Sequence, residues 1–156
     1  MKNNYAIFPG SFDPITLGHI SIIHNSLKIF PTIIVAIGVN NNKNNMYSLT
    51  KRKELIESVF QNEQRILIKE YQILTVDFCK KNNANHIIRG VRNTQDFKYE
   101  RDIALANEEL DSNIKTIFIP AKKEHIFISS TIVREIITHK GDLTSFLHPQ
   151  TINQIT

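Results

Sequence analysis

Short runs of apolar residues alternate along the chain with segments in which apolar residues recur every three or four positions. The runs have the length and β-branched character of buried strands, and they lie at Tyr5–Phe8, Thr32–Val39, Arg65–Lys69, His86–Ile88 and Lys115–Ile119. The segments between them have helical periodicity, as in the stripe Leu55, Ile56, Val59, Phe60. This alternation predicts a parallel, doubly wound α/β sheet with helices on both faces.

Residue types at the segment boundaries predict where the helices begin and end. The expected helices start after Thr16, after Thr50, near Ile73, after Asn93 or Thr94, and after Ser129 or Ser130. The third of these should reach Lys81, the fourth about Leu110, and the fifth about Thr138 with Gly141 closing it. One or two short helical turns are expected between Asp142 and Thr156.

The connection between the first strand and the first helix has the features of an anion site. We expect the strand to break at Pro9–Gly10 and the helix to start near Leu17, with Thr16 as its N-cap. The first N–H groups of a helix lack partners and lie at the positive end of its dipole, so they stabilise a phosphate. His19, in the first turn, would add a side-chain donor at the same place.

Three segments together resemble a known family. They are Pro9–His19 (PGSFDPITLGH), Arg89–Glu100 (RGVRNTQDFKYE) and Ile128–Glu135 (ISSTIVRE). The first is similar to the T-x-G-H signature of the nucleotidylyltransferase superfamily, which class I aminoacyl-tRNA synthetases share. With all three segments in this order and spacing, nearly the whole chain resembles the bacterial phosphopantetheine adenylyltransferases, the penultimate enzymes of coenzyme A synthesis.

The resemblance implies a fold and a reaction. The fold would be a single Rossmann-like nucleotidylyltransferase domain over residues 1–156, with five parallel strands in the order 3-2-1-4-5. Ligands bind such sheets beyond the carboxyl ends of the strands, where the strand order reverses, which here lies between the first and fourth strands. The reaction would be reversible transfer of the adenylyl group of ATP to 4′-phosphopantetheine, giving dephospho-coenzyme A and pyrophosphate.

The resemblance also assigns roles to particular residues. His19 would be the catalytic residue and would stabilise the transition state at the α-phosphate. The residues implied to bind ATP are Ser11, Phe12, His19, Gly90, Val91, Arg92, Glu100, His125, Ile126, Phe127, Ile128, Ser129, Ser130 and Thr131. Those implied to bind 4′-phosphopantetheine are Ser11, Lys43, Thr75 and Arg89. Three positions depart from the family, which commonly has Pro at position 45, Leu or Met at position 75 and an aromatic residue at position 125.

The residue inventory fits this chemistry. The attacking oxygen would belong to a phosphate ester that is already an anion at neutral pH, so catalysis needs positioning and charge stabilisation but no general base. Mg²⁺ is expected as a cofactor carried with ATP, bound by phosphate oxygens and waters and without protein metal ligands.

Composition restricts the partners and the location. The chain is 41% hydrophobic and 22% charged, with 19 Lys+Arg against 15 Asp+Glu and a formal net charge of +4. This charge suits anionic ligands, but the basic residues are scattered, so nucleic acid is not expected as a partner. Without an apolar run of about 18 residues or a signal peptide, we expect no membrane association and a cytoplasmic location. The single Cys79 is expected to be a buried core thiol, and the family resemblance implies a homohexamer.

The first motif also fits functions other than this one. The nearest are another small nucleotidylyltransferase, acting on nicotinate mononucleotide or glycerol phosphate, and a non-catalytic nucleotide-binding module. A tRNA-synthetase fragment is disfavoured because the chain lacks a K-M-S-K-S loop and an anticodon-binding region. A dehydrogenase or P-loop ATPase is disfavoured because neither glycine-rich phosphate motif is present.

Overall fold

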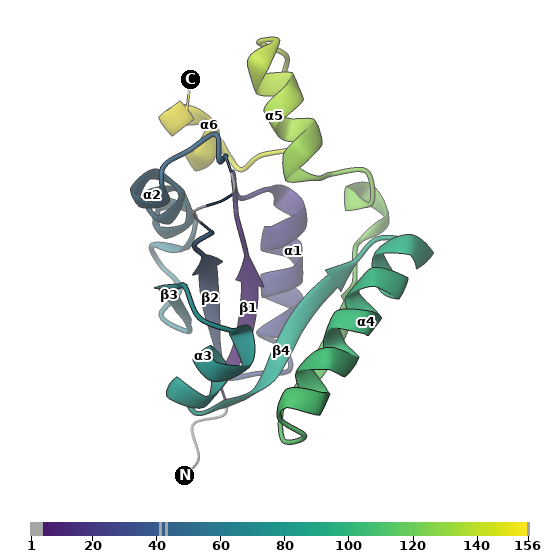
Figure 1. Cartoon of the computed structure of the whole chain (residues 1–156). Coiled ribbons are helices and arrows are strands. Elements are labelled where there is room, and N and C mark those ends of the chain that lie inside the picture. Colours follow the sequence, from purple (N-terminus) through teal and green to yellow (C-terminus); the bar gives the residue numbers. More distant parts are fainter. Residues whose placement is uncertain (1–4, 41, 43, 156) are drawn as a thin grey trace.

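Five parallel strands form one sheet in the order β3-β2-β1-β4-β5, which confirms the expected topology. The structure is a computed structural model that describes residues 5–40, 42 and 44–155 (Figure 1). Its strands are β1 (Tyr5–Gly10), β2 (Thr32–Gly38), β3 (Ile66–Tyr71), β4 (Ala84–Val91) and β5 (Lys115–Pro120). Its helices are α1 (Leu17–Ser26), α2 (Leu49–Phe60), α3 (Thr75–Lys81), α4 (Thr94–Leu110), the 3₁₀ turn η1 (Lys123–His125), α5 (Ser130–Thr138) and α6 (Pro149–Ile155).

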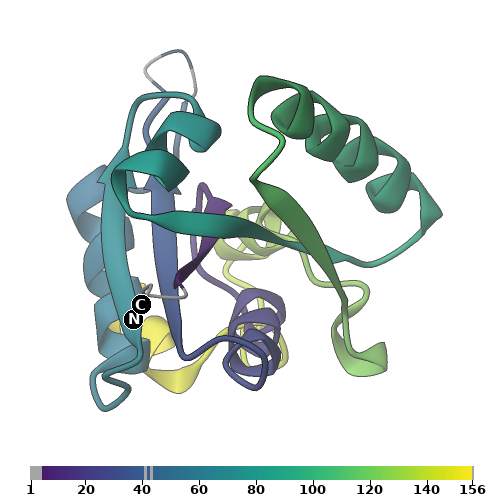
Figure 2. The same ribbon diagram turned by 90° about the horizontal axis from the view of Figure 1, so that it is seen from below.

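Alternate residues of the strands face two hydrophobic cores, one on each side of the sheet. Ala6 and Phe8 of β1 pack with the apolar faces of α1 and α2, whereas Ile7 packs with α3 on the other side. Helix α4 covers this second side near β4 and β5, and it stands well apart from β2 and β3 in Figure 2. The doubly wound arrangement therefore follows the period-two pattern of the strands.

A third, smaller hydrophobic cluster holds the C-terminal part of the chain near the carboxyl ends of the strands. It consists of Ile128, Val133, Leu143 and Leu147, and Leu17 of α1 packs against it. Helices α5 and α6 lie beyond the ends to which the strand arrowheads point (Figure 1). This packing sets the N-terminus of α5 near that of α1.

Several element boundaries differ from the sequence predictions. Strand β1 does not break at Pro9–Gly10, because both residues continue the parallel pairing with Ala36 and Ile37 of β2. Strand β4 extends on both sides of the predicted segment, from Ala84 to Val91. Tertiary pairing lengthened these strands beyond what their apolar runs indicated.

Two predicted helix starts were also wrong. The N-cap of α2 is Ser48, which accepts a hydrogen bond from the N–H of Lys51, and not Thr50. Helix α3 starts at Thr75 rather than near Ile73. Helix α5 ends at Thr138 as predicted, and Gly141 closes it by donating its N–H to the carbonyl oxygen of Ile136, after Lys140 in the left-handed conformation (φ 56°). The predicted N-caps Thr16 and Ser129 are confirmed.

Candidate active site

The candidate site is a crevice that opens because β1 and β4 stop pairing near their carboxyl ends. Their pairing ends at Ile7 and Ile87, while β1 continues with β2 to Gly10 and β4 continues with β5 to Val91. Beyond this point Arg89 donates a hydrogen bond from Nη1 to the carbonyl oxygen of Pro9 over 2.8 Å. An arginine side chain thus occupies the place of the next backbone contact between the two strands.

A cavity of about 340 Å³ lies at this crevice, above α1. Most residues predicted to bind ATP line it: Ser11, Phe12, His19, Gly90, Val91, Arg92, Glu100, His125, Ile128, Ser129, Ser130 and Thr131. Ile126 and Phe127 are not among the lining residues; both are about half exposed, and the ring of Phe127 meets that of Phe146 edge-on. Three segments far apart in the sequence therefore meet in one cavity.

His19 is held in a single orientation by the first turn of α1. Its Nδ1 accepts a hydrogen bond from the N–H of Thr16 over 3.1 Å, while the Thr16 hydroxyl accepts one from the N–H of His19. This is a capping box in which a histidine occupies the N3 position. The rings of Phe8 and Phe12 lie 6.2 and 5.1 Å from the imidazole, centroid to centroid.

These contacts define the protonation state of His19. Because Nδ1 accepts a backbone N–H, the proton of the neutral ring resides on Nε2, which remains a donor. Desolvation lowers the pKa of His19 to about 4, and the nearby positive charges of Arg89 and Arg92 act in the same direction. At neutral pH the residue is therefore an uncharged hydrogen-bond donor at a helix N-terminus.

The loop that follows β1 is fixed by the start of α5. Ser129 caps the helix by accepting the N–H of Ile132, and the hydroxyl of Ser130 donates to the carbonyl oxygen of Pro14 over 3.0 Å. Arg134 donates to the carbonyl oxygen of Asp13 over 2.9 Å. The N-termini of α1 and α5 thus contribute to one anion-binding region.

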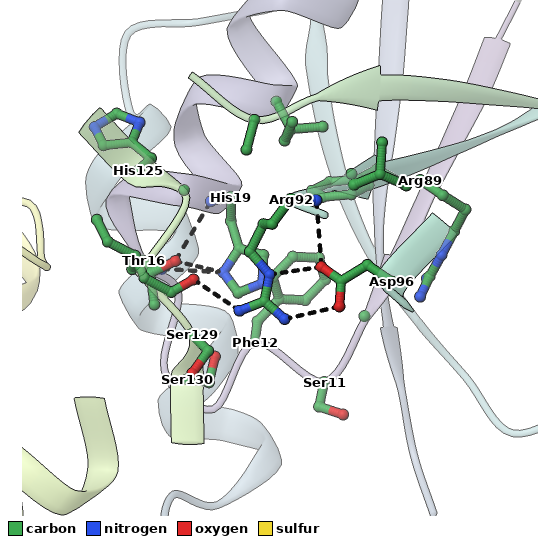
Figure 3. Close-up of a pocket in the computed structure, with 18 of the residues that line it drawn as sticks. Ser11, Phe12, Thr16, His19, Arg89, Arg92, Asp96, His125, Ser129 and Ser130 are labelled. Carbon is green, nitrogen blue, oxygen red and sulfur yellow. Dashed lines mark hydrogen bonds and ion pairs between the residues drawn. The ribbon is translucent and has the colours of Figure 1, made fainter. Parts of the chain in front are cut away.

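Two arginines at the end of β4 are paired with carboxylates of α4. Arg89 makes a bidentate pair with Glu100, with N–O distances of 2.6 and 2.5 Å. Arg92 pairs with Asp96 at 2.7 and 3.1 Å and donates to the carbonyl oxygen of Ile128 over 3.2 Å (Figure 3). The guanidinium of Arg92 holds the pKa of Asp96 below its ordinary value.

A second cavity of about 760 Å³ lies on the other side of Arg89. It contains Thr75, whose hydroxyl lies 3.0 Å from that of Tyr71. The residues that line both cavities are Pro9, Gly10, Ser11, Arg89 and Glu100. Lys43, the remaining predicted ligand of the acceptor phosphate, lies outside the described residues.

Two buried residues, Asp13 and Arg52, support this site without lining either cavity, and the sequence did not indicate them. Asp13 is 3% exposed, and its carboxylate accepts the N–H groups of Met46 and Tyr47 over 2.8 and 2.9 Å. Arg52, 2% exposed, donates to the carbonyl oxygen of Ser11 over 2.7 Å. Their partners are more than 30 positions away in the sequence, so no local spacing indicated these roles. Asp96 could have been found, because it lies four residues after Arg92 at a helix start.

A resident metal ion would need several ligand side chains close together in the described part of the chain. No group of three or more His, Cys, Asp or Glu side chains there is arranged to hold a metal ion. The carboxylates that line the smaller cavity, Asp96 and Glu100, face arginines. The donor set consequently favours phosphate oxygens over a resident metal.

Comparisons with known proteins agree with this arrangement. Residues 7–136 match the family model described as cytidylyltransferase-like. The phosphopantetheine adenylyltransferase of Flavobacterium psychrophilum is 48% identical over 147 residues, which cover 94% of this chain and 96% of that protein. The chain belongs to the phosphopantetheine adenylyltransferase family. Its members in Bacteroides thetaiotaomicron and Thermotoga neapolitana are 42% and 39% identical, covering 91% and 93% of this chain and 93% and 90% of theirs.

Two solved structures share the fold of this family member. One, described as a nicotinate-nucleotide adenylyltransferase from Vibrio parahaemolyticus, has a TM-score of 0.76 at 20% identity and covers 99% of both chains. The other is the Plasmodium falciparum nicotinic acid mononucleotide adenylyltransferase, with a TM-score of 0.71 at 22% identity, covering 98% of this chain and 94% of that one. At these identities the likeness shows a shared fold.

Two further expectations concern the rest of the molecule. Cys79 is completely buried, and desolvation raises the pKa of its thiol to about 12, which confirms a core thiol without nucleophilic character. None of the helices in the described ranges is long and apolar enough to cross a membrane.

Proposed function

We propose that this chain transfers the adenylyl group of ATP to 4′-phosphopantetheine, releasing pyrophosphate and forming dephospho-coenzyme A, in a reversible reaction. The observation that carries the proposal is the position of His19. Its neutral Nε2–H donor lies at the N-terminus of α1, in a cavity that shares a wall with a second one. Membership of the phosphopantetheine adenylyltransferase family supports ATP and 4′-phosphopantetheine as the two substrates.

The chemistry is an in-line displacement at phosphorus. A phosphate oxygen of 4′-phosphopantetheine attacks the α-phosphorus of ATP and forms a new P–O bond. The bond from the α-phosphorus to the bridging β-phosphate oxygen breaks, and pyrophosphate leaves with the electron pair. His19 donates a hydrogen bond to the α-phosphate oxygen on which charge develops, and this stabilises the transition state. No proton transfer is required of the protein.

ATP would occupy the smaller cavity. The N–H groups of Ser130 and Thr131 and the hydroxyls of Ser129 and Thr131 at the start of α5 suit the β- and γ-phosphates, while the Ser130 hydroxyl donates to the carbonyl oxygen of Pro14. Gly90, Val91 and Arg92 would line the nucleotide side, with Phe12, His125 and Ile128 completing it. These roles follow from the family resemblance and from their shared cavity.

4′-Phosphopantetheine would occupy the larger cavity. Arg89 and Lys43 would hold its phosphate, Ser11 would contact both substrates, and Thr75 would contact the pantetheine arm. This assignment is supported by the presence of Ser11, Thr75 and Arg89 in the wall of the second cavity. Ser11 and Arg89 also line the first, so the attacking phosphate would arrive beside the α-phosphate.

Magnesium would enter with ATP. Mg²⁺ bound to the phosphates lowers the charge that the attacking anion meets. The residues of this cavity fit such a complex, because arginine, serine and backbone donors hold phosphate oxygens rather than the ion itself. We also propose that the chain works as a homo-oligomer, a hexamer by family resemblance, in the cytoplasm.

The test is pyrophosphate release with ATP and Mg²⁺ in the presence of 4′-phosphopantetheine, nicotinate mononucleotide or glycerol 3-phosphate, the last also with CTP. Of these acceptors, we expect only 4′-phosphopantetheine to support turnover. His19→Ala should lower kcat on the order of a hundred-fold or more, because it removes one transition-state donor. Turnover with another acceptor would overturn the substrate assignment. Binding of ATP by a folded protein that turns over none of them would instead indicate a nucleotide-binding module.

A further inference from the structure

Helix α2 carries an arginine that is buried behind the loop between β1 and α1. Arg52 is 2% exposed, and its Nη1 donates to the carbonyl oxygen of Ser11 over 2.7 Å. Its Nε has no hydrogen-bond partner among the described residues. Desolvation lowers the pKa of the guanidinium, while the carboxylate of Asp13 acts in the opposite direction. A buried charge with so few partners is costly, so Arg52 is not explained by its contribution to stability.

The residue after Ser11 has a backbone conformation that a large side chain seldom adopts. Phe12 has a φ of 48°, in the left-handed region, and is 1% exposed. Its ring meets those of Phe8 and His19 at centroid distances of 5.6 and 5.1 Å. Packing therefore fixes the ring, and the hydrogen bond from Arg52 fixes the carbonyl group just before it. Together they hold a strained turn in one conformation.

The hydrogen bond from Arg52 also sets the direction of the peptide group between Ser11 and Phe12. The C=O and N–H of a trans peptide point in opposite directions, so the N–H of Phe12 points away from the guanidinium. This N–H donates to no acceptor among the described residues. Because Phe12 lines the smaller cavity, a phosphate oxygen bound there would supply the acceptor that a buried N–H requires.

Two further carbonyl groups of this loop are held in a similar way. Those of Asp13 and Pro14 accept hydrogen bonds from Arg134 and Ser130 of α5. Both of these donors line the smaller cavity, whereas Arg52 lines neither cavity. Replacing Arg52 therefore changes the support of the loop without removing a side chain from the wall of either cavity.

We propose that Arg52 is a positioning residue for the transfer step, which acts through the Ser11 carbonyl oxygen and holds the N–H of Phe12 towards the reacting phosphates. The proposal rests on the function proposed above, in which Ser11 and Phe12 contact the substrates. Ser11 lines both cavities, so this peptide lies where the acceptor phosphate would meet the α-phosphate of ATP. A donor fixed before the substrates bind stabilises the charge of the transition state without reorganisation.

The test compares Arg52→Met with the wild type in single-turnover measurements of dephospho-coenzyme A formation. Met fills similar space without a charge or a donor, and an apolar replacement of a buried charge is often tolerated by the fold. At saturating substrates the rate should fall about tenfold or more. It should fall by a larger factor than the Kd for ATP or for 4′-phosphopantetheine rises. An unchanged rate, or a fall no larger than the rise in Kd, would overturn the inference.

Two other replacements test the hydrogen bond to Ser11. Arg52→Lys keeps a charged donor close to the place of the guanidinium and should recover part of the rate that Arg52→Met loses. Arg52→Gln keeps a polar group that ends short of the carbonyl oxygen, so it should be as slow as Arg52→Met and replaces it if that variant does not fold. A lysine variant as slow as the other two would contradict the proposed role.

The control for folding lies one turn further along α2. Ile56 is completely buried and borders neither cavity, so Ile56→Val should lower the melting temperature without slowing the transfer step. An equal loss of rate in this variant would show general destabilisation and overturn the inference. A wild type inactive with 4′-phosphopantetheine would overturn the proposed function itself. An active wild type matched by Arg52→Met would overturn only the role of Arg52.

Discussion

At the scale of single residues, the chemistry depends on an imidazole that is kept neutral. The backbone N–H of Thr16 occupies Nδ1 of His19, and desolvation lowers its pKa to about 4. A histidine with an ordinary pKa near 6.5 would be partly charged at neutral pH. The structure instead presents a donor on Nε2 throughout the neutral range, so its hydrogen bond to a developing oxyanion does not depend on pH there.

This pKa predicts a specific pH dependence of stability. The unfolded chain binds a proton at His19 below about pH 6.5, whereas the folded chain does not until about pH 4. The free energy of unfolding should therefore fall as the pH is lowered from about 6.5 to 4. Urea denaturation of the wild type and of His19→Asn at several pH values measures this. The free energy of unfolding of the wild type, relative to that of His19→Asn, should fall towards acid. A pH-independent difference between the two free energies would contradict the prediction.

Lys43 provides a second prediction at this scale. If its ammonium holds the acceptor phosphate, Lys43→Ala should raise the KM for 4′-phosphopantetheine much more than that for ATP, because only the acceptor loses a charge partner. Initial rates with each substrate varied in turn give both constants. Equal effects on both substrates would refute this role.

At the scale of elements, the site forms where the sheet and two helices end together. Strands β1 and β4 stop pairing after Ile7 and Ile87, and the N-termini of α1 and α5 lie over the opening. Neither helix contains a cluster of lysines; each contributes the positive end of its dipole and a capping side chain. The site therefore depends on the integrity of single caps.

Removing the cap of α5 should affect ATP binding as well as stability. Ser129→Ala deletes the acceptor for the N–H of Ile132 and should cost about 1 kcal/mol of stability. It should also raise the KM for ATP, because the start of α5 would lose its order around the phosphates. Thermal melts and kinetics measure the two effects.

Ser48→Ala is the matched control, since Ser48 caps α2 in the same way and borders neither cavity. It should lose similar stability without a change in the KM for ATP. A parallel rise in both variants would show that the effect of Ser129 is general destabilisation. Thr50→Ala should be close to neutral, because Thr50 lies inside α2 and is not its cap.

At the scale of the whole molecule, α4 exposes a large apolar surface. Tyr99, Leu105 and Leu110 are each more than half exposed, and Glu100 is the buried residue of the helix. Surface of this kind commonly marks contacts between subunits. Figure 2 shows α4 at the outside of the molecule, and the helix packs against β4, β5 and α3.

We therefore expect a change on this helix to weaken self-association. Leu105→Glu should lower the mass measured by light scattering during size-exclusion chromatography, because a charge would be buried in the contact. Ile29→Glu is matched in exposure, at 58% for both residues, but lies beyond α1 and should leave the mass unchanged. A monomeric wild type would contradict the predicted oligomer.

The sequence by itself determined the strands and helices and, through the family resemblance, their order and most of the site. Apolar runs and helical stripes are local, so they indicated the five strands, while the resemblance implied the order 3-2-1-4-5 and with it the crevice between β1 and β4. The motifs around His19, Arg89 and Ser129 gave the residues that meet in the smaller cavity. Capping residues such as Thr16 could be predicted from the sequence, because their hydrogen bonds join residues only three positions apart.

Only the tertiary structure decided the contacts between distant segments. Ser48 and Thr50 are both suitable caps, and Ser48 was selected because Asp13 binds the N–H groups of Met46 and Tyr47 just before it. Likewise, the spacing of Arg89 and Glu100 did not show that they pair, since one lies on a strand and the other on a helix. Such contacts depend on where folding brings two elements together, and that information is not present in either element by itself.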